Sequence, residues 1–122
     1  MGVIIQRYLQ EALDLSRQLD SPTSVADILV KWGELELKHE RWDAAAQHFR
    51  ECLEADAEVG VKKQDVAIAH YGLAREAFAR GDISQAYNWA QKSLEAFEGT
   101  QHYRVAEVKD WLMALDKTHI EN

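Results

Sequence analysis

The chain has 122 residues, of which 47% are hydrophobic and 29% are charged, a composition typical of one folded globular domain rather than of a disordered segment. Its formal net charge is −7 and its longest basic run is a pair of lysines, so repulsion of phosphates argues against nucleic-acid binding. It has one cysteine, and it lacks the apolar run of roughly 18 residues that a membrane span needs. We therefore expect a protein of the cytoplasm, without membrane contact.

Apolar residues recur at spacings of three and four along the whole chain, and no segment alternates in the way of a half-buried strand. Gly60, Gly81 and Gly99 each follow an amphipathic segment, at the place where a left-handed residue ends a helix. Asp82 precedes another segment, with Gln85 three residues later, which resembles a capping box. The pattern predicts an all-α protein of six antiparallel helices joined by short turns. We place these helices near residues 3–19, 23–39, 43–59, 64–79, 83–97 and 102–118.

Two types of helix alternate along the chain, beginning with the second type. Helices of the first type start with a Val-Ala pair, and the three pairs lie 41 and 39 residues apart. A large apolar residue follows each alanine by six positions. The three sets are Val25–Ala26 with Trp32, Val66–Ala67 with Leu73, and Val105–Ala106 with Leu112.

Helices of the second type carry an apolar or small residue, a second one four positions later, and then a small residue followed by leucine. A six-helix bundle also supplies spacings of three and four, but it does not repeat the same small residues in the same helix type. We therefore interpret the pattern as a stacked repeat, in which near-copies of a helix pair build a continuous core. The sets are Ile5, Leu9 and Ala12–Leu13; Ala45, Phe49 and Cys52–Leu53; and Ala86, Ala90 and Ser93–Leu94.

These motifs resemble the tetratricopeptide repeat family, whose first helix carries a large residue, then Leu-Gly and an aromatic, and whose second helix carries Ala-x₃-Phe. Glu36 stands where the family has the aromatic residue, and the closing proline is missing. The period of about 40 residues, rather than about 34, resembles an extended variety of the family. The matching segments are Leu29-x₂-Trp32-Gly33 with Ala45-x₃-Phe49, and Leu73-Ala74-x₂-Ala77 with Ala86-x₃-Ala90.

The resemblance implies a short right-handed superhelix of helix pairs that binds other proteins, with no catalytic role, no cofactor and no metal. We expect a single domain over residues 1–122. In bacteria this variety often resembles the sensor arrays of signalling ATPases and transcription regulators. Two alternatives to a binding module therefore stay open, such a sensor segment and a structural or oligomerising fragment that acts through its exposed ends. The expected parts are an unpaired second-type helix at 1–20, repeats at 23–60 and 64–99, and a capping helix at 102–118.

The residues themselves offer little support for chemistry. Glu36-x₂-His39 has the spacing by which a helix presents two metal ligands, but di-iron bundles need that motif twice and it occurs once. Cys52 is expected to be a small buried residue of the core. No nucleophile and base share a catalytic spacing, and no glycine-rich phosphate loop occurs.

In this family the first-type helices line the concave face, so positions one, four, eight and eleven after each Val-Ala alanine are predicted to face a partner. An apolar centre flanked by acids favours a helical or extended peptide with basic flanks. A second interpretation stays open, in which Tyr71 and Phe78 pack in the core. The candidate groove residues are Asp27, Val30, Glu34, Leu37, Ile68, Tyr71, Arg75 and Phe78, to which the last helix adds Glu107, Asp110, Ala114 and Lys117.

The first helix carries more apolar residues than one neighbouring helix covers, and exposed patches of this kind usually meet a partner. We expect a homodimer in which this helix contacts its own copy through Ile4, Ile5, Tyr8 and Leu9. In the alternative interpretation, these residues pack fully against the 23–39 helix.

Overall fold

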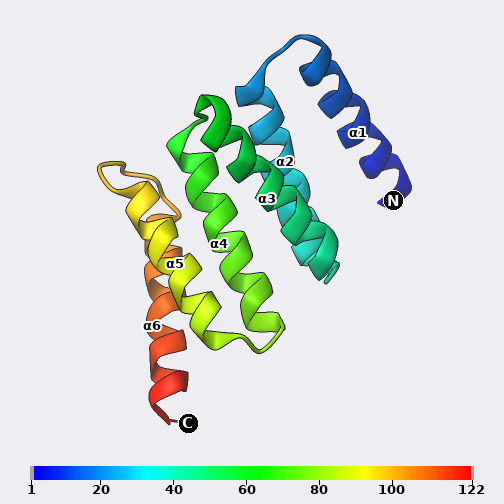
Figure 1. Cartoon of the computed structure of the whole chain (residues 1–122). Coiled ribbons are helices and arrows are strands. Elements are labelled where there is room, and N and C mark those ends of the chain that lie inside the picture. Colours follow the sequence, from blue (N-terminus) through cyan, green and yellow to red (C-terminus); the bar gives the residue numbers. More distant parts are fainter. Residues whose placement is uncertain (1, 122) are drawn as a thin grey trace.

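A computed structural model describes the backbone of residues 2–121 and the side chains of residues 3–117. Every secondary-structure element within these residues is an α-helix, which confirms the all-α prediction. The helices follow one another as a row, with α1 at one end and α6 at the other (Figure 1). Their bounds are α1 (Gly2–Gln18), α2 (Pro22–Lys38), α3 (Trp42–Val59), α4 (Lys63–Ala79), α5 (Ile83–Phe97) and α6 (Val105–Glu121).

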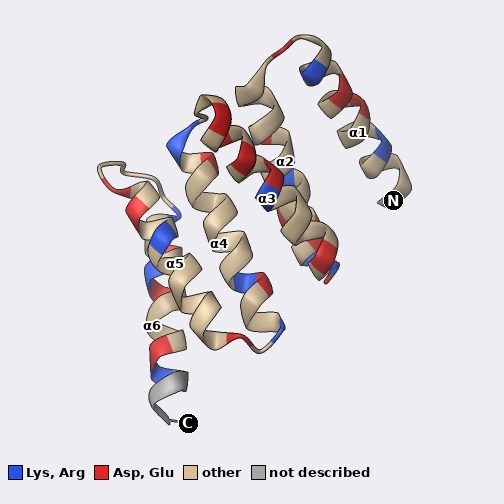
Figure 2. Cartoon of the chain, in the orientation of Figure 1, with Lys and Arg blue, Asp and Glu red and all other residues tan. Residues whose placement is uncertain are grey.

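Each helix packs on its neighbour in sequence, and the pairs α2–α3 and α4–α5 correspond to the two predicted repeats. Contacts also join helices that are not adjacent in sequence, because α4 packs against α2 as well as against α3. Figure 2 shows that the middle of α4 has no charged residue, as expected for a helix with neighbours on several sides. No helix among the described residues has the length and apolar character that a bilayer crossing requires.

The predicted bounds agree with the structure to within one residue for the first five helices, but the sixth begins at Val105 rather than at residue 102. The residues before it form a turn that is held to the end of α5. The Thr100 hydroxyl donates to the carbonyl of Phe97 at 2.6 Å, and the His102 ring stacks on the Phe97 ring at a centroid distance of 5.0 Å. These local contacts hold the segment in a turn and compete with the helical conformation that the spacing of its residues predicted.

Helix ends follow the predicted chemistry where glycine or aspartate supplies it. Gly60, Gly81 and Gly99 have φ angles of +75°, +83° and +81°, which confirms left-handed residues at these three ends. The Asp82 carboxylate accepts a hydrogen bond from the Gln85 backbone N–H at 3.1 Å, which confirms the N-cap.

Phe49 of α3 lies in the tightest part of the core and has no exposed surface. Its ring sits between two glycines, Gly33 of α2 and Gly72 of α4, so that the backbones of both helices approach it closely. In the next pair the corresponding residue is Ala90, which packs in a cluster with Ala74. The two helix pairs thus fill the equivalent position in different ways. The first pair places a large ring between two glycines, and the second pair packs alanines together.

Two buried glutamates near the ends of α2 and α4 are each neutralised by an arginine of the following turn. Glu36 is 3% exposed and pairs with Arg41, whose Nε and Nη2 donate at 2.7 and 3.2 Å. Burial raises the pKa of Glu36, but the hydrogen bonds and charge of Arg41 outweigh it, so the pKa is lowered. Glu76 is likewise 3% exposed and accepts from Arg80 Nε at 2.7 Å. Glu36 can therefore occupy the buried position where the family has an aromatic residue, because Arg41 neutralises its charge.

Candidate functional site

The first-type helices α2, α4 and α6 share one surface of the row, which we call the inner face. The segment that enters α6 contributes to it as well, because Arg104 lies directly before that helix. The inner face divides into a closed half, centred on Tyr71, and an open half, centred on Phe78.

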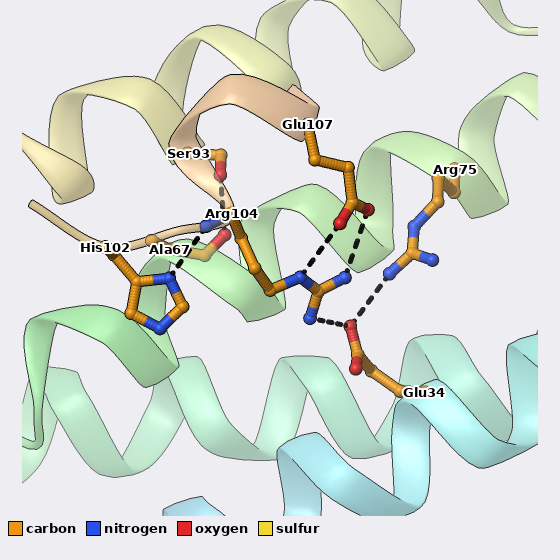
Figure 3. A network of polar contacts seen from close by, with 7 residues as sticks. All are labelled: Glu34, Ala67, Arg75, Ser93, His102, Arg104 and Glu107. Carbon is orange, nitrogen blue, oxygen red and sulfur yellow. Dashed lines mark hydrogen bonds and ion pairs between the residues drawn. The ribbon is translucent and has the colours of Figure 1, made fainter. Parts of the chain in front are cut away.

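The closed half is sealed by a network of ion pairs that connects three helices (Figure 3). Glu34 Oε1 of α2 accepts from Arg75 Nη2 of α4 at 3.0 Å and from Arg104 Nη1 at 2.5 Å. Arg104 also binds Glu107 of α6, at 3.3 Å from Nε and 3.2 Å from Nη2. Burial lowers the pKa of Arg104, but Glu107 and Glu34 outweigh it and raise that pKa, so the guanidinium stays charged.

Tyr71 lies beneath this network and is 4% exposed. The Arg75 guanidinium stacks over its ring at 4.2 Å, and the Trp111 ring meets it edge-on at 5.8 Å. Burial raises the pKa of the Tyr71 phenol to about 12, and Glu107 contributes through a hydrogen bond. Val30 of α2 is also buried, with 4% exposure. Tyr71 and Val30 are therefore core residues, and the interpretation of Tyr71 as core is the one that the structure supports.

The open half is a groove of about 710 Å³ between α2, α4 and α6. Phe78 lies in it with 46% of its surface exposed, and its ring meets Trp111 edge-on at 5.9 Å. Two cations, Lys38 and Arg75, stand beside this apolar floor. The groove is lined by Glu34, Leu37, Lys38, Trp42, Arg75, Phe78, Ala79 and Trp111.

A comparison with protein-family models found a match to the model described as tetratricopeptide repeat, over residues 24–99. This range covers both helix pairs, α2–α3 and α4–α5, except for the first two residues of α2. The chain belongs to the tetratricopeptide repeat family. Comparisons with curated proteins and with solved structures returned no match.

The tetratricopeptide array brings together at the groove four of the eight residues predicted on α2 and α4, namely Glu34, Leu37, Arg75 and Phe78. Leu37 is only 6% exposed and contributes to the floor from within the core. Ile68 is half-buried and packs against two core clusters.

Asp27, the last of the eight residues predicted on α2 and α4, belongs to a separate carboxylate pair. Its Oδ2 accepts from Lys62 Nζ at 3.3 Å, and it shares a hydrogen bond with Asp65, which is 5% exposed. Burial and the neighbouring Asp27 charge raise the pKa of Asp65 to about 7. Burial also raises the pKa of Asp27, but hydrogen bonds from Asp65 and Lys62 outweigh it and lower that pKa.

Other residues that the sequence singled out are not part of the groove. Asp110 and Lys117 of α6 are exposed outside its lining, and Ala114 is exposed in a smaller hollow beside Phe78. His39 is exposed, while Glu36 is turned into the core toward Arg41, so the two do not present a joint ligand site.

Sequence reasoning missed five residues of the inner face: Lys38, Trp42, Ala79, Arg104 and Trp111. Lys38 and Trp111 each follow a predicted stripe position by one residue, so strict spacing passes over them. Trp42 begins a second-type helix, whereas the prediction placed the binding face on the first-type helices alone. The bulk of the two tryptophans was the available signal, because large aromatic residues often line binding sites.

The first helix of the tetratricopeptide array leaves most of its predicted contact residues uncovered. Ile4 and Tyr8 are 75% and 71% exposed, Ile5 is 36% exposed, and Leu9 is half-buried. The interpretation in which these residues pack fully against α2 is therefore wrong, because α2 covers the opposite side of α1, where Leu13 is 3% exposed.

Proposed function

We propose that this tetratricopeptide array binds a segment of a partner protein in the groove between α2, α4 and α6. Repeats of this family generally mediate protein–protein interactions, which supports a binding role. The observation that carries the proposal is Phe78, a large aromatic residue that is 46% exposed inside a groove of about 710 Å³. Exposed aromatics in concave sites are typical anchors of binding energy.

The charges of the groove favour a partner segment with an apolar anchor and an adjacent carboxylate. Glu34 is already bound by Arg75 and Arg104, so it offers little attraction to a basic ligand. Lys38 is exposed, and no carboxylate among the described residues lies within ion-pair distance of it. The basic flanks expected from the sequence depended on the acids of the predicted groove. Asp27, Glu34 and Glu107 have internal partners, and Asp110 lies outside the groove lining, so we do not propose basic flanks for the partner.

We place this binding in the cytoplasm. Cys52 is a buried free thiol, which suits a reducing compartment. Burial raises its pKa to about 12, with smaller contributions from Asp65, Asp56 and Asp27, so the thiol stays protonated.

The test is a selection of peptides from a random display library against the intact chain, followed by calorimetric titration of the selected peptides. Phe78→Ala is expected to weaken binding by about tenfold or more, as for an anchor residue. Lys38→Glu is expected to weaken binding selectively for peptides that carry a carboxylate beside the anchor.

Arg50→Glu is the matched control, because Arg50 is exposed on α3 and lies outside the groove lining. It reverses the same charge as Lys38→Glu and should leave the affinity unchanged. Selected peptides that bind the Phe78→Ala variant as well as the unmodified protein would show that the groove is not the binding site.

A further inference from the structure

The outer side of α1 carries a stripe of exposed apolar residues, interrupted by Glu11. Ile4, Tyr8 and Leu15 are 75%, 71% and 55% exposed, and Leu19, in the turn after α1, is 70% exposed. Spacings of three and four place Ile4, Tyr8, Glu11 and Leu15 on one line along the helix, which is the pattern of a helix–helix seam. The opposite side of α1, with Leu13 and Ser16 at 3% and 8% exposure, packs on α2.

The repeat itself indicates that this stripe is a packing surface. Tyr8, His48 and Trp89 occupy matching positions of α1, α3 and α5, at separations of 40 and 41 residues. His48 stacks on Trp32 of α2 at 4.4 Å, and Trp89 stacks on His70 of α4 at 5.4 Å. Each of these two rings is covered by the helix that precedes it. Tyr8, by contrast, is 71% exposed, and no ring among the described residues stacks on it.

The other end of the row does not complement α1. The exposed residues of α6 are mostly charged, with Lys109, Asp110 and Lys117 around Met113. An apolar stripe does not match such a surface, so head-to-tail stacking of copies is disfavoured.

We propose that α1 binds α1 of a second copy, antiparallel, across a two-fold axis between Tyr8 and Glu11. This arrangement places Ile4 against Leu15 of the second copy and lets the Tyr8 hydroxyl donate to the opposing Glu11 carboxylate. Arg7 and Asp14 lie along the same edge of the stripe, seven residues apart, so each Arg7 faces the opposing Asp14. Opposite charges on the edges of paired helices set their orientation, and here they match for two antiparallel copies.

The interface is small, since about four apolar side chains per copy fall short of the roughly 800 Å² per partner of a standard interface. We therefore expect a dimer that dissociates in the micromolar range. The contact is separate from the groove, so this inference does not depend on the proposed binding function.

Charge exchange between Arg7 and Asp14 tests the proposal by sedimentation equilibrium. Arg7→Asp and Asp14→Arg each place like charges at both edge contacts, so each variant alone is expected to dissociate at a concentration at least about tenfold higher. In an equimolar mixture, one copy carries only carboxylates at the two edge positions and the other carries only guanidinium groups. Both edge contacts then join opposite charges, and the dimer is expected to recover.

Circular dichroism of each variant verifies that α1 stays helical. Arg50→Asp is the control, because it makes the same charge change as Arg7→Asp at an exposed site of α3. An unmodified chain that remains monomeric at tens of micromolar overturns the proposal. A mixture that fails to associate, or a ladder of species beyond the dimer, overturns the two-fold arrangement as well.

Discussion

Replacement of Gly72 by alanine puts a methyl group against the ring of Phe49, and the structure allows the cost to be worked out. A Cβ atom built on Gly33 would lie 2.6 Å from the ring, and one built on Gly72 would lie closer still. The ring cannot retreat, because the other glycine backbone stands on its far side and Phe49 has no exposed surface. Such overpacking costs about 1–3 kcal/mol. Alanine recovers about 1 kcal/mol as the better helix former, so we expect a net loss of up to about 2 kcal/mol of unfolding free energy.

The assay is urea denaturation followed by circular dichroism, applied as a double-mutant cycle with Phe49→Leu. The leucine side chain makes room for the new methyl group. The double variant is therefore expected to lose less unfolding free energy than the sum of the losses of the two single variants. Gly33→Ala, which has the longer contact, is expected to cost less than Gly72→Ala. The reasoning is refuted if Gly72→Ala stabilises the protein by the helix-propensity gain alone, or if the cycle shows no coupling.

Three further predictions concern the core and its titrating groups. Ala45→Leu, at a fully buried site, should cost about 1–3 kcal/mol of unfolding free energy. Gln47→Leu, at an exposed site of the same helix, should change it by less than about 0.5 kcal/mol. Equal effects of the two substitutions in thermal melts would contradict the packing of α3. The pKa of Asp65 is 3.8 in the unfolded chain and about 7 in the folded protein. Its favourable contribution to the free energy of unfolding is therefore fully present below pH 3.8 and is lost as the pH rises to about 7. Asp65→Asn should therefore gain stability relative to the unmodified protein across that window, and denaturation curves with a pH-independent difference would count against it. The Cys52 thiol, buried and with its pKa raised to about 12, should react with an aromatic disulfide reagent only as fast as the protein opens, so rapid labelling under native conditions would disprove its burial.

The sequence was sufficient for the fold because the repeat makes each local signal appear more than once. Ala45 and Ala86 both have no exposed surface, and Cys52 and Ser93 are buried at matching positions. The sequence located the ends of α1 and α2 to within one residue but did not predict the left-handed residues after them, since Asp20 and Glu40 adopt φ angles of +51° and +58° where glycine is usual. At these two turns, the packing of the neighbouring helices imposes a backbone conformation that the local sequence does not predict.

The candidate site was harder to predict because the contacts between its residues follow neither the helical spacing nor the repeat length. Helical spacing correctly grouped Glu34, Arg75 and Phe78, but it could not show that Arg104, 70 residues from Glu34 along the chain, closes half of the surface. The placement of Tyr71 in the core follows from that closure and not from its own position in α4. Long-range ion pairs of this kind depend on the exact stacking of helices, which a single sequence does not specify.

The shared carboxylate of Glu34 gives the array an uneven response to mechanical load. Because it binds Arg75 and Arg104 together, any bending that spreads α2, α4 and α6 must stretch ion pairs at the inner edge (Figure 3). At the opposite end, α1 is tied to the row by its packing on α2 and by one solvent-exposed ion pair, Arg17 with Glu51. Exposed pairs of this kind resist little force. We therefore expect a pull along the row to separate α1 from α2 before it spreads α2, α4 and α6.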